Sequence, residues 1–226
     1  MTEFAIHEAE LTGALTDLLM GIVIIPLLVV LCLTKSSERR TKTWAVIFFS
    51  ALCASCFLGY LAHNVFTDGT PNTVVWSVLL PLLYEDFASF FLFAVALFTR
   101  GNKPDTKLTV FAEAFVACAL VVSLIVSPPY NDTHIRILVI AGGALALTGF
   151  VLIAVNAFRR FSIGERVMIS SLILLLPAAY FQVSRKAFIH CIWYFDCNGI
   201  AHILIMLGII AVFVGVLVCL RRKTDN

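Results

Sequence analysis

Charged residues are scarce in this sequence. They make up 13% of the 226 residues, whereas a soluble domain of ordinary composition carries about 25%. Hydrophobic residues make up 61%, and the mean hydropathy is +0.99. With so few charged side chains to face water, the chain is expected to be an integral, multi-pass membrane protein. Its net charge of +2 favours no acidic partner, and nucleic acid is not expected among its partners.

The sequence also lacks the motifs of several common soluble enzyme classes. It holds no P-loop, no G-x-S-x-G elbow and no dinucleotide-binding fingerprint. It shows neither a repeat of fixed period nor a low-complexity tract. We therefore expect residues 1–226 to form one domain.

Long apolar runs are the main feature that is present. A helix needs roughly 20 apolar residues to cross a bilayer, and seven runs are long enough. They predict an all-α fold, a bundle of seven transmembrane helices. The expected helices cover about 13–34, 43–63, 73–98, 107–127, 134–158, 164–184 and 199–220.

The basic residues predict how this bundle is oriented. Thirteen of the 16 follow the first, third, fifth and seventh helices and would lie on one side of the membrane. Only Arg136, Arg185 and Lys186 fall on the other side. Because cytoplasmic loops carry the excess of Lys and Arg, we expect the N-terminus outside and the C-terminus in the cytoplasm.

Two features of the predicted external loops agree with this orientation. Asn131-Asp132-Thr133 is an N-glycosylation sequon between the fourth and fifth helices. Cys191 and Cys197 lie in the loop before the last helix, on the side where a disulfide persists. Glycosylation of Asn131 and a Cys191–Cys197 disulfide are therefore predicted.

Ionisable residues within the apolar runs are the candidates for function. Such residues are costly in hydrocarbon, usually face the bundle interior and often mark a functional site. They are Asp17, His63, Glu85, Asp86, Glu113 and His202. Asp17, His63 and His202 belong to three different helices, yet each would lie within about 10 Å of the external interface. Asn198 precedes His202 by one helical turn, so the two share a face.

Two interpretations of this polar layer remain open. Each residue alone is typical of an interfacial side chain that reaches the headgroups or pairs with a neighbouring helix. Together they are typical of a metal site, in which His63 and His202 bind zinc and a carboxylate and water complete the shell. A catalytic zinc makes a hydrolytic nucleophile of its bound water at neutral pH.

The polar residues also carry a family likeness. The chain resembles the CREST superfamily of seven-helix proteins, which includes the alkaline ceramidases and the progestin/adipoQ receptors, and is most similar to its uncharacterised members. The likeness spans the whole topology but rests on few residues: Leu11-Thr12-Gly13-Ala14-Leu15-Thr16-Asp17, Gly59-Tyr60-Leu61-Ala62-His63 and Phe195-Asp196-Cys197-Asn198-Gly199-Ile200-Ala201-His202. It implies zinc-dependent hydrolysis of a lipid amide or ester, with Asp86 handling protons.

Two positions depart from the pattern of that superfamily. Asn198 stands where the first histidine of the last helix is expected, which removes one zinc ligand. Gly59 stands where a serine is expected, and Ser55 lies one turn further back. Asp17 or the thiolate of Cys197 would then replace the missing ligand, or the site no longer holds zinc.

Two functions therefore compete. The first is a membrane-embedded zinc hydrolase of a lipid, with His63, His202 and Asp17 on the metal. The second is a non-catalytic receptor or ligand-binding protein that uses the same external cavity. A retinal protein is disfavoured because all six lysines lie in loops or at helix ends, where no buried Schiff base can form. A transporter is also disfavoured, since neither an inverted repeat nor paired broken helices are visible.

Overall fold

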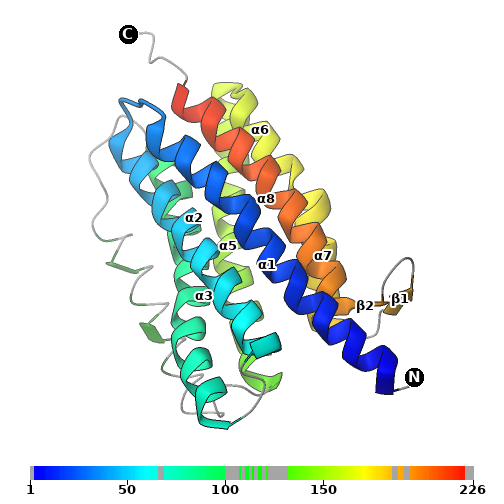
Figure 1. Cartoon of the computed structure of the whole chain (residues 1–226). Coiled ribbons are helices and arrows are strands. Elements are labelled where there is room, and N and C mark those ends of the chain that lie inside the picture. Colours follow the sequence, from blue (N-terminus) through cyan, green and yellow to red (C-terminus); the bar gives the residue numbers. More distant parts are fainter. Residues whose placement is uncertain are drawn as a thin grey trace.

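The computed structural model describes residues 3–65, 69–99, 132–184, 188–190 and 194–221, and single positions between 107 and 121. Helices dominate these residues (Figure 1). They are α1 (Glu3–Leu33), α2 (Arg39–Tyr60) with its π-helical continuation η1 (Leu61–Val65), α3 (Gly69–Phe98), α5 (Asp132–Arg160), α6 (Ile163–Ser170), α7 (Leu172–Ser184) and α8 (Cys197–Arg221).

Six spans in the described part of the chain are long and apolar enough to cross a membrane. A helix suits that role because its backbone groups bond to one another within the segment. The six match the first three and the last three of the seven predicted helices. The fourth predicted helix, 107–127, falls mostly outside the described residues.

The spans close into a ring (Figure 1). α1 packs against α2 on one side and against α8 on the other, and α2 packs against α3. α3 packs against α5, which contacts α6, and both α6 and α7 pack against α8. The C-terminus and the start of α1 lie at opposite ends of the bundle.

Aromatic side chains fill much of the core between these helices. Phe49 on α2 meets Phe213 on α8 edge to face, with ring centroids 5.6 Å apart. Phe90 on α3 meets Phe150 on α5 at 4.8 Å. Such pairs add attraction beyond the area they bury, so they help to hold α2, α3, α5 and α8 together.

The span predicted as one helix over 164–184 is interrupted. α6 ends at Ser170 and α7 begins at Leu172. At Ser171 the backbone N–H and the hydroxyl both donate to the carbonyl of Met168, at 3.2 and 2.6 Å. This local bonding competes with the regular helical ladder, and it interrupts the helix one and a half turns before Pro177.

The prediction of an all-α fold is correct apart from one small hairpin. Strands β1 (Phe188–His190) and β2 (Tyr194–Asp196) pair antiparallel immediately before α8. Ile189 lies opposite Phe195 in this register. Because β2 leads directly into α8 and contacts α1, the hairpin helps to fix the start of α8 beside α1.

Candidate functional site

A cavity of about 370 Å³ lies inside the ring of helices. Its walls are mostly apolar, with side chains such as Leu83, Leu138, Phe150 and Leu175. Polar side chains are few and come from several helices. They are Asp17, Ser55, His63, Asp86, Gln182, Asn198 and His202. The predicted site residues Asp17, His63, Asp86, Asn198 and His202 thus all line one cavity.

Asp17 and His202 form one polar pair in this cavity. The Nδ1 of His202, on α8, lies 3.3 Å from the Oδ1 of Asp17, on α1. The same nitrogen lies 3.1 Å from the Oγ1 of Thr16 and 3.3 Å from the carbonyl of Gly13. Both Asp17 and His202 are buried. The pair therefore ties the first and last helices together inside the membrane span.

The neighbours of His202 decide which ring nitrogen carries a proton. The hydroxyl of Thr16 donates to the carbonyl of Gly13 at 2.6 Å, so its oxygen is left to accept from the imidazole. The carbonyl of Gly13 and the carboxylate of Asp17 are acceptors only. Nδ1 is therefore assigned the hydrogen from this network. In the neutral ring Nε2 is then left with a lone pair.

Gly59 on α2 makes room for the carboxylate of Asp17. A Cβ atom at this position would lie 2.7 Å from the Oδ2 of Asp17, closer than van der Waals contact allows. A serine there, as in the resembling family, would displace the carboxylate. The absence of a side chain at Gly59 is therefore what allows Asp17 to take its observed position.

Asp86 and Ser55 form a second polar pair in the wall of the cavity. The hydroxyl of Ser55, one turn before Gly59 on α2, donates to the Oδ2 of Asp86 at 3.0 Å. Asp86 is 6% exposed, and its Oδ1 has no hydrogen-bond partner among the described residues. Its neighbour on α3, Glu85, does not line the cavity. Of the two adjacent acids, only Asp86 lines the cavity.

His63 and Asn198 lie at the rim of this arrangement. His63 belongs to the π-helical turn η1, and its ring meets the ring of Trp76 edge to face with centroids 5.7 Å apart. Asn198 lies in the first turn of α8, close to Gly13. Asp196 begins that helix by accepting the N–H of Gly199 at 2.8 Å. Asn198 and His202 therefore share a face of α8, as their spacing predicts.

The described residues do not fit a catalytic zinc. Among them, no three His, Cys, Asp or Glu side chains form a group that could hold a metal ion. Asp17 contacts the Nδ1 of His202, so it is placed to orient the imidazole rather than to share an ion with it. Zinc stays a prediction, and no step below passes through it.

Three predictions for the loops and the fourth helix lie partly or wholly outside the described residues. Asn131 and Glu113 are not among these residues. Cys197 is buried, and Cys191, its predicted partner, is not described. The disulfide and the glycosylation site therefore stay predictions.

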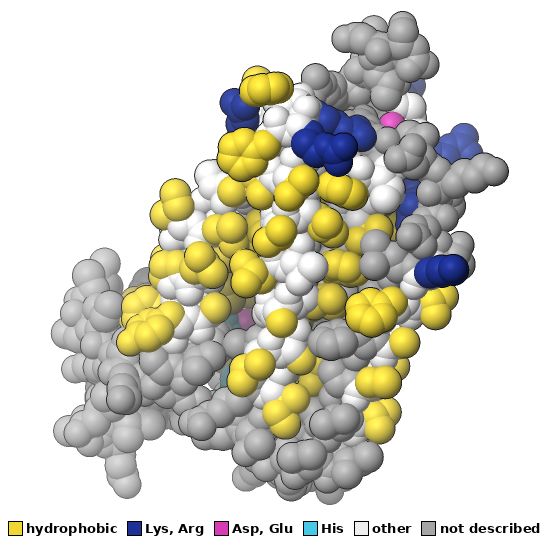
Figure 2. Space-filling model, turned by 180° about the vertical axis from the view of Figure 1, so that it is seen from behind, with side chains coloured by type: hydrophobic (Ala, Val, Ile, Leu, Met, Phe, Trp, Pro, Cys, Tyr) yellow, Lys and Arg dark blue, Asp and Glu magenta, His cyan; other side chains and the backbone are white. Residues whose placement is uncertain are grey.

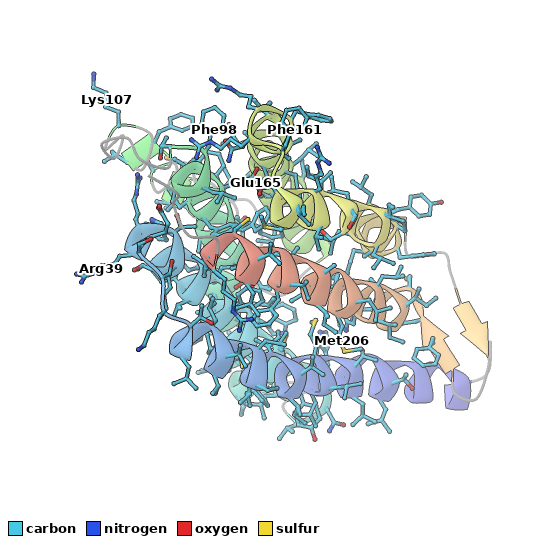
Figure 3. All side chains as sticks on the ribbon, turned by 90° about the horizontal axis from the view of Figure 1, so that it is seen from above. Arg39, Phe98, Lys107, Phe161, Glu165 and Met206 are labelled. Atoms are coloured by element: carbon cyan, nitrogen blue, oxygen red, sulfur yellow. The ribbon has the colours of Figure 1, made fainter. Side chains whose placement is uncertain are left out.

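A third buried acid, Glu165, lies at the other end of the bundle and is not among the residues that the apolar runs single out. Glu165 on α6 is 2% exposed, and the amide of Asn156 on α5 donates to its Oε1 at 2.7 Å. Figure 3 shows Glu165 pointing among the helices, whereas Arg39 and Lys107 point away from them. Glu165 sits next to Arg166 at a helix start, where an acid ordinarily faces solvent, so its burial could not be predicted from its position in the sequence.

Comparisons with other proteins identify a family but no function. No protein of curated function matches the chain. No solved structure matches it either. A family model does match, over residues 12–220, which include all six described spans almost in full. The chain therefore belongs to the family of unknown function DUF6962.

Proposed function

We propose that this protein is a seven-helix membrane protein that binds a lipid-like small molecule in the cavity between its helices. The binding is non-catalytic, as in a receptor or carrier of an amphipathic ligand. The N-terminus is outside and the C-terminus is cytoplasmic. Asp17, His63 and His202 then lie toward the external side of the membrane, and the cavity extends inward from them to Phe48 and Val212.

A seventh span over 107–127 is supported by the positions described there. Val110, Phe111 and Val121 are helical and more than half exposed. In an aqueous protein such side chains would be buried, whereas lipid accepts them on the outside of a helix. A span between α3 and α5 also returns the chain to the side on which α5 begins.

The orientation is supported by where the basic side chains gather. Figure 2 shows Lys and Arg toward the upper part of the molecule, with hydrophobic side chains below them. Arg39 at the start of α2, Arg160 at the end of α5 and Arg221 at the end of α8 belong to this group. This is the arrangement that the positive-inside rule assigns to the cytoplasmic side.

The observation that carries the binding function is the composition of the cavity wall. An apolar cavity with a few convergent polar groups is the usual form of a small-molecule site. Here the polar groups, Asp17, His202 and Asp86, come from three helices and face one apolar space. A ligand with an apolar chain and a polar head satisfies both parts.

The test is to fill the cavity without disturbing the helices. Gly143 lines the cavity, and a Cβ atom added there would meet nothing within 4 Å. Purified full-length protein in phosphatidylcholine nanodiscs should bind radiolabelled dodecanol above empty nanodiscs. Gly143→Leu should weaken that binding at least about tenfold, while Ile140→Phe on the outer face of α5 should not. Equal binding by both variants would refute the proposal.

A lipid hydrolase is the second candidate, and one observation favours it. The contact between Asp17 and the Nδ1 of His202 matches the way a carboxylate orients a catalytic imidazole. The resemblance to the CREST superfamily points the same way. Release of fatty acid from a lipid amide or ester, abolished in His202→Ala, would favour this candidate over non-catalytic binding.

A further inference from the structure

We infer that the ligand of this cavity carries a cationic amine, and that its ammonium group pairs with Asp86. This inference rests on the proposed binding function and adds the chemical class of the ligand's head. Asp86 is assigned as the residue that selects the amine.

The first observation is the incomplete bonding of Asp86. Its carboxylate receives one hydrogen bond, from Ser55 at 3.0 Å. Its other oxygen, Oδ1, is buried and has no hydrogen-bond partner in the part of the chain that the structure describes. A carboxylate buried in an apolar setting without compensation is costly. A donor from a ligand would remove part of that cost.

The second observation is the balance of charge around the cavity. Two carboxylates, Asp17 and Asp86, line it, but no lysine or arginine of the described chain does. The lining histidines are His63 and His202. His202 makes its contacts with Asp17, Thr16 and Gly13, on α1, and not with Asp86. In the described wall, no lysine or arginine therefore balances Asp86.

An alkylamine matches both parts of the cavity wall, since it has a cationic head and an apolar chain. A protonated amine brings the missing positive charge and up to three N–H donors, and charge-assisted bonds are the stronger kind. Its hydrocarbon chain would lie against apolar side chains of the same cavity, among them Phe87, Leu138 and Phe150. An alcohol of equal length offers one neutral donor, and a fatty acid would bring a second negative charge.

The experiment compares two ligands that differ only in the head group. Radiolabelled dodecylamine and dodecanol are titrated into full-length protein in neutral phosphatidylcholine nanodiscs, with empty nanodiscs as the background. We expect wild-type protein to bind the amine at least about tenfold more tightly than the alcohol. Asp86→Asn should remove this preference, so that the amine and the alcohol bind to the variant with equal affinity.

Glu85→Gln is the matched control, because it removes an acidic charge from the adjacent position of α3, outside the cavity. It should keep the full preference for the amine. Equal affinity of the wild type for both ligands would overturn the inference and leave the proposed function standing. A preference that survives Asp86→Asn would overturn the role of Asp86. Binding of neither ligand by the wild type would overturn the proposed function itself.

Discussion

Single side chains decide how the polar groups of this protein sit in an apolar bundle. Asp17 reaches His202 from α1 because Gly59, on the facing helix, leaves the space for its carboxylate. Ser55, one turn away on the same helix, holds Asp86 instead. Ser55 thus binds Asp86 through its hydroxyl, and Gly59 accommodates Asp17 because it has no side chain.

Gly59→Ala should therefore displace Asp17. The added Cβ would lie 2.7 Å from Oδ2, and crowding of this kind typically costs about 1–3 kcal/mol. We expect a lower unfolding temperature and weaker dodecanol binding. Gly143→Ala, which adds a methyl group to open space, should change the unfolding temperature little. If the two variants unfold at the same temperature, the close approach of Gly59 to Asp17 is wrong.

Asn156→Leu should destabilise the protein from the other end of the bundle. It removes the donor that lies 2.7 Å from the buried carboxylate of Glu165, and loss of one partner of a buried polar pair costs about 1–3 kcal/mol. Replacing both residues by leucine should recover much of the loss, since no buried charge then remains. Thermal unfolding of the two variants in nanodiscs makes the comparison. A double variant no more stable than Asn156→Leu would contradict the pairing.

The residues of the cavity could be predicted in part from sequence. Asp17, His63 and His202 stood out because ionisable groups are rare in membrane helices, and their depth followed from helical rise. The contact between Asp17 and His202 could not be predicted, because it depends on how α1 and α8 face each other. Glu165 was missed because burial at a helix end depends on which helix covers it.

Among the elements, α6 and α8 approach each other closely at two glycines. A Cβ atom on Gly215 would lie 2.4 Å from the Cγ of Met168 and 2.5 Å from the carbonyl of Gly164. A Cβ atom on Gly164 would lie 2.6 Å from the carbonyl of Gly215. Small residues allow such contacts between membrane helices, so this pair of glycines fixes where the two helices cross.

Gly215→Leu should push α6 and α8 apart. Overpacking should lower the free energy of unfolding by about 1–3 kcal/mol. The measurement is a lower unfolding temperature in nanodiscs. Val214→Leu enlarges the neighbouring side chain, which is 44% exposed on the outside of α8, and should have little effect. A stable Gly215→Leu variant would show that the helices do not cross at this point.

The predicted helices were most accurate where only apolar length mattered. Small residues of α5 allow close helix contact, since Gly142 and Gly149 lie against Phe87 and Phe90 of α3. Gly143, from the same set, faces the cavity instead. The break at Ser171 and the π turn η1 were not predicted, because both arise from local bonding that an apolar run does not encode.

At the scale of the whole molecule, the polar cavity residues and the basic side chains lie in different parts of the ring of helices. His63 lies in the last turn of its span and Asn198 in the first turn of α8, whereas Lys and Arg gather toward the upper part of the molecule in Figure 2. By the positive-inside rule, the basic loops in the sequence and this charged end of the structure indicate the same orientation in the membrane. The ring closure itself could not be read from the sequence, since it requires knowing that α1 packs beside α8.

A reporter fused to the C-terminus tests the orientation of the molecule. An enzyme or fluorescent protein that is active only in the cytoplasm should be active there, because the basic residues at the ends of α5 and α8 anchor that side. The same reporter fused before residue 1 should be inactive. The opposite result would place Asp17, His63 and His202 toward the cytoplasmic side of the membrane.

Trp76 and His63 stand edge to face in the wall of the cavity, with their ring planes at 90°. An imidazolium ring quenches the emission of a neighbouring indole, and a change in the polarity of its surroundings shifts the colour of that emission. If Trp44 and Trp193 are replaced by phenylalanine, the light from Trp76 reports on this cavity alone. The molecule thus carries a fluorophore in the wall of its cavity, and the emission of Trp76 is expected to change colour as the cavity fills.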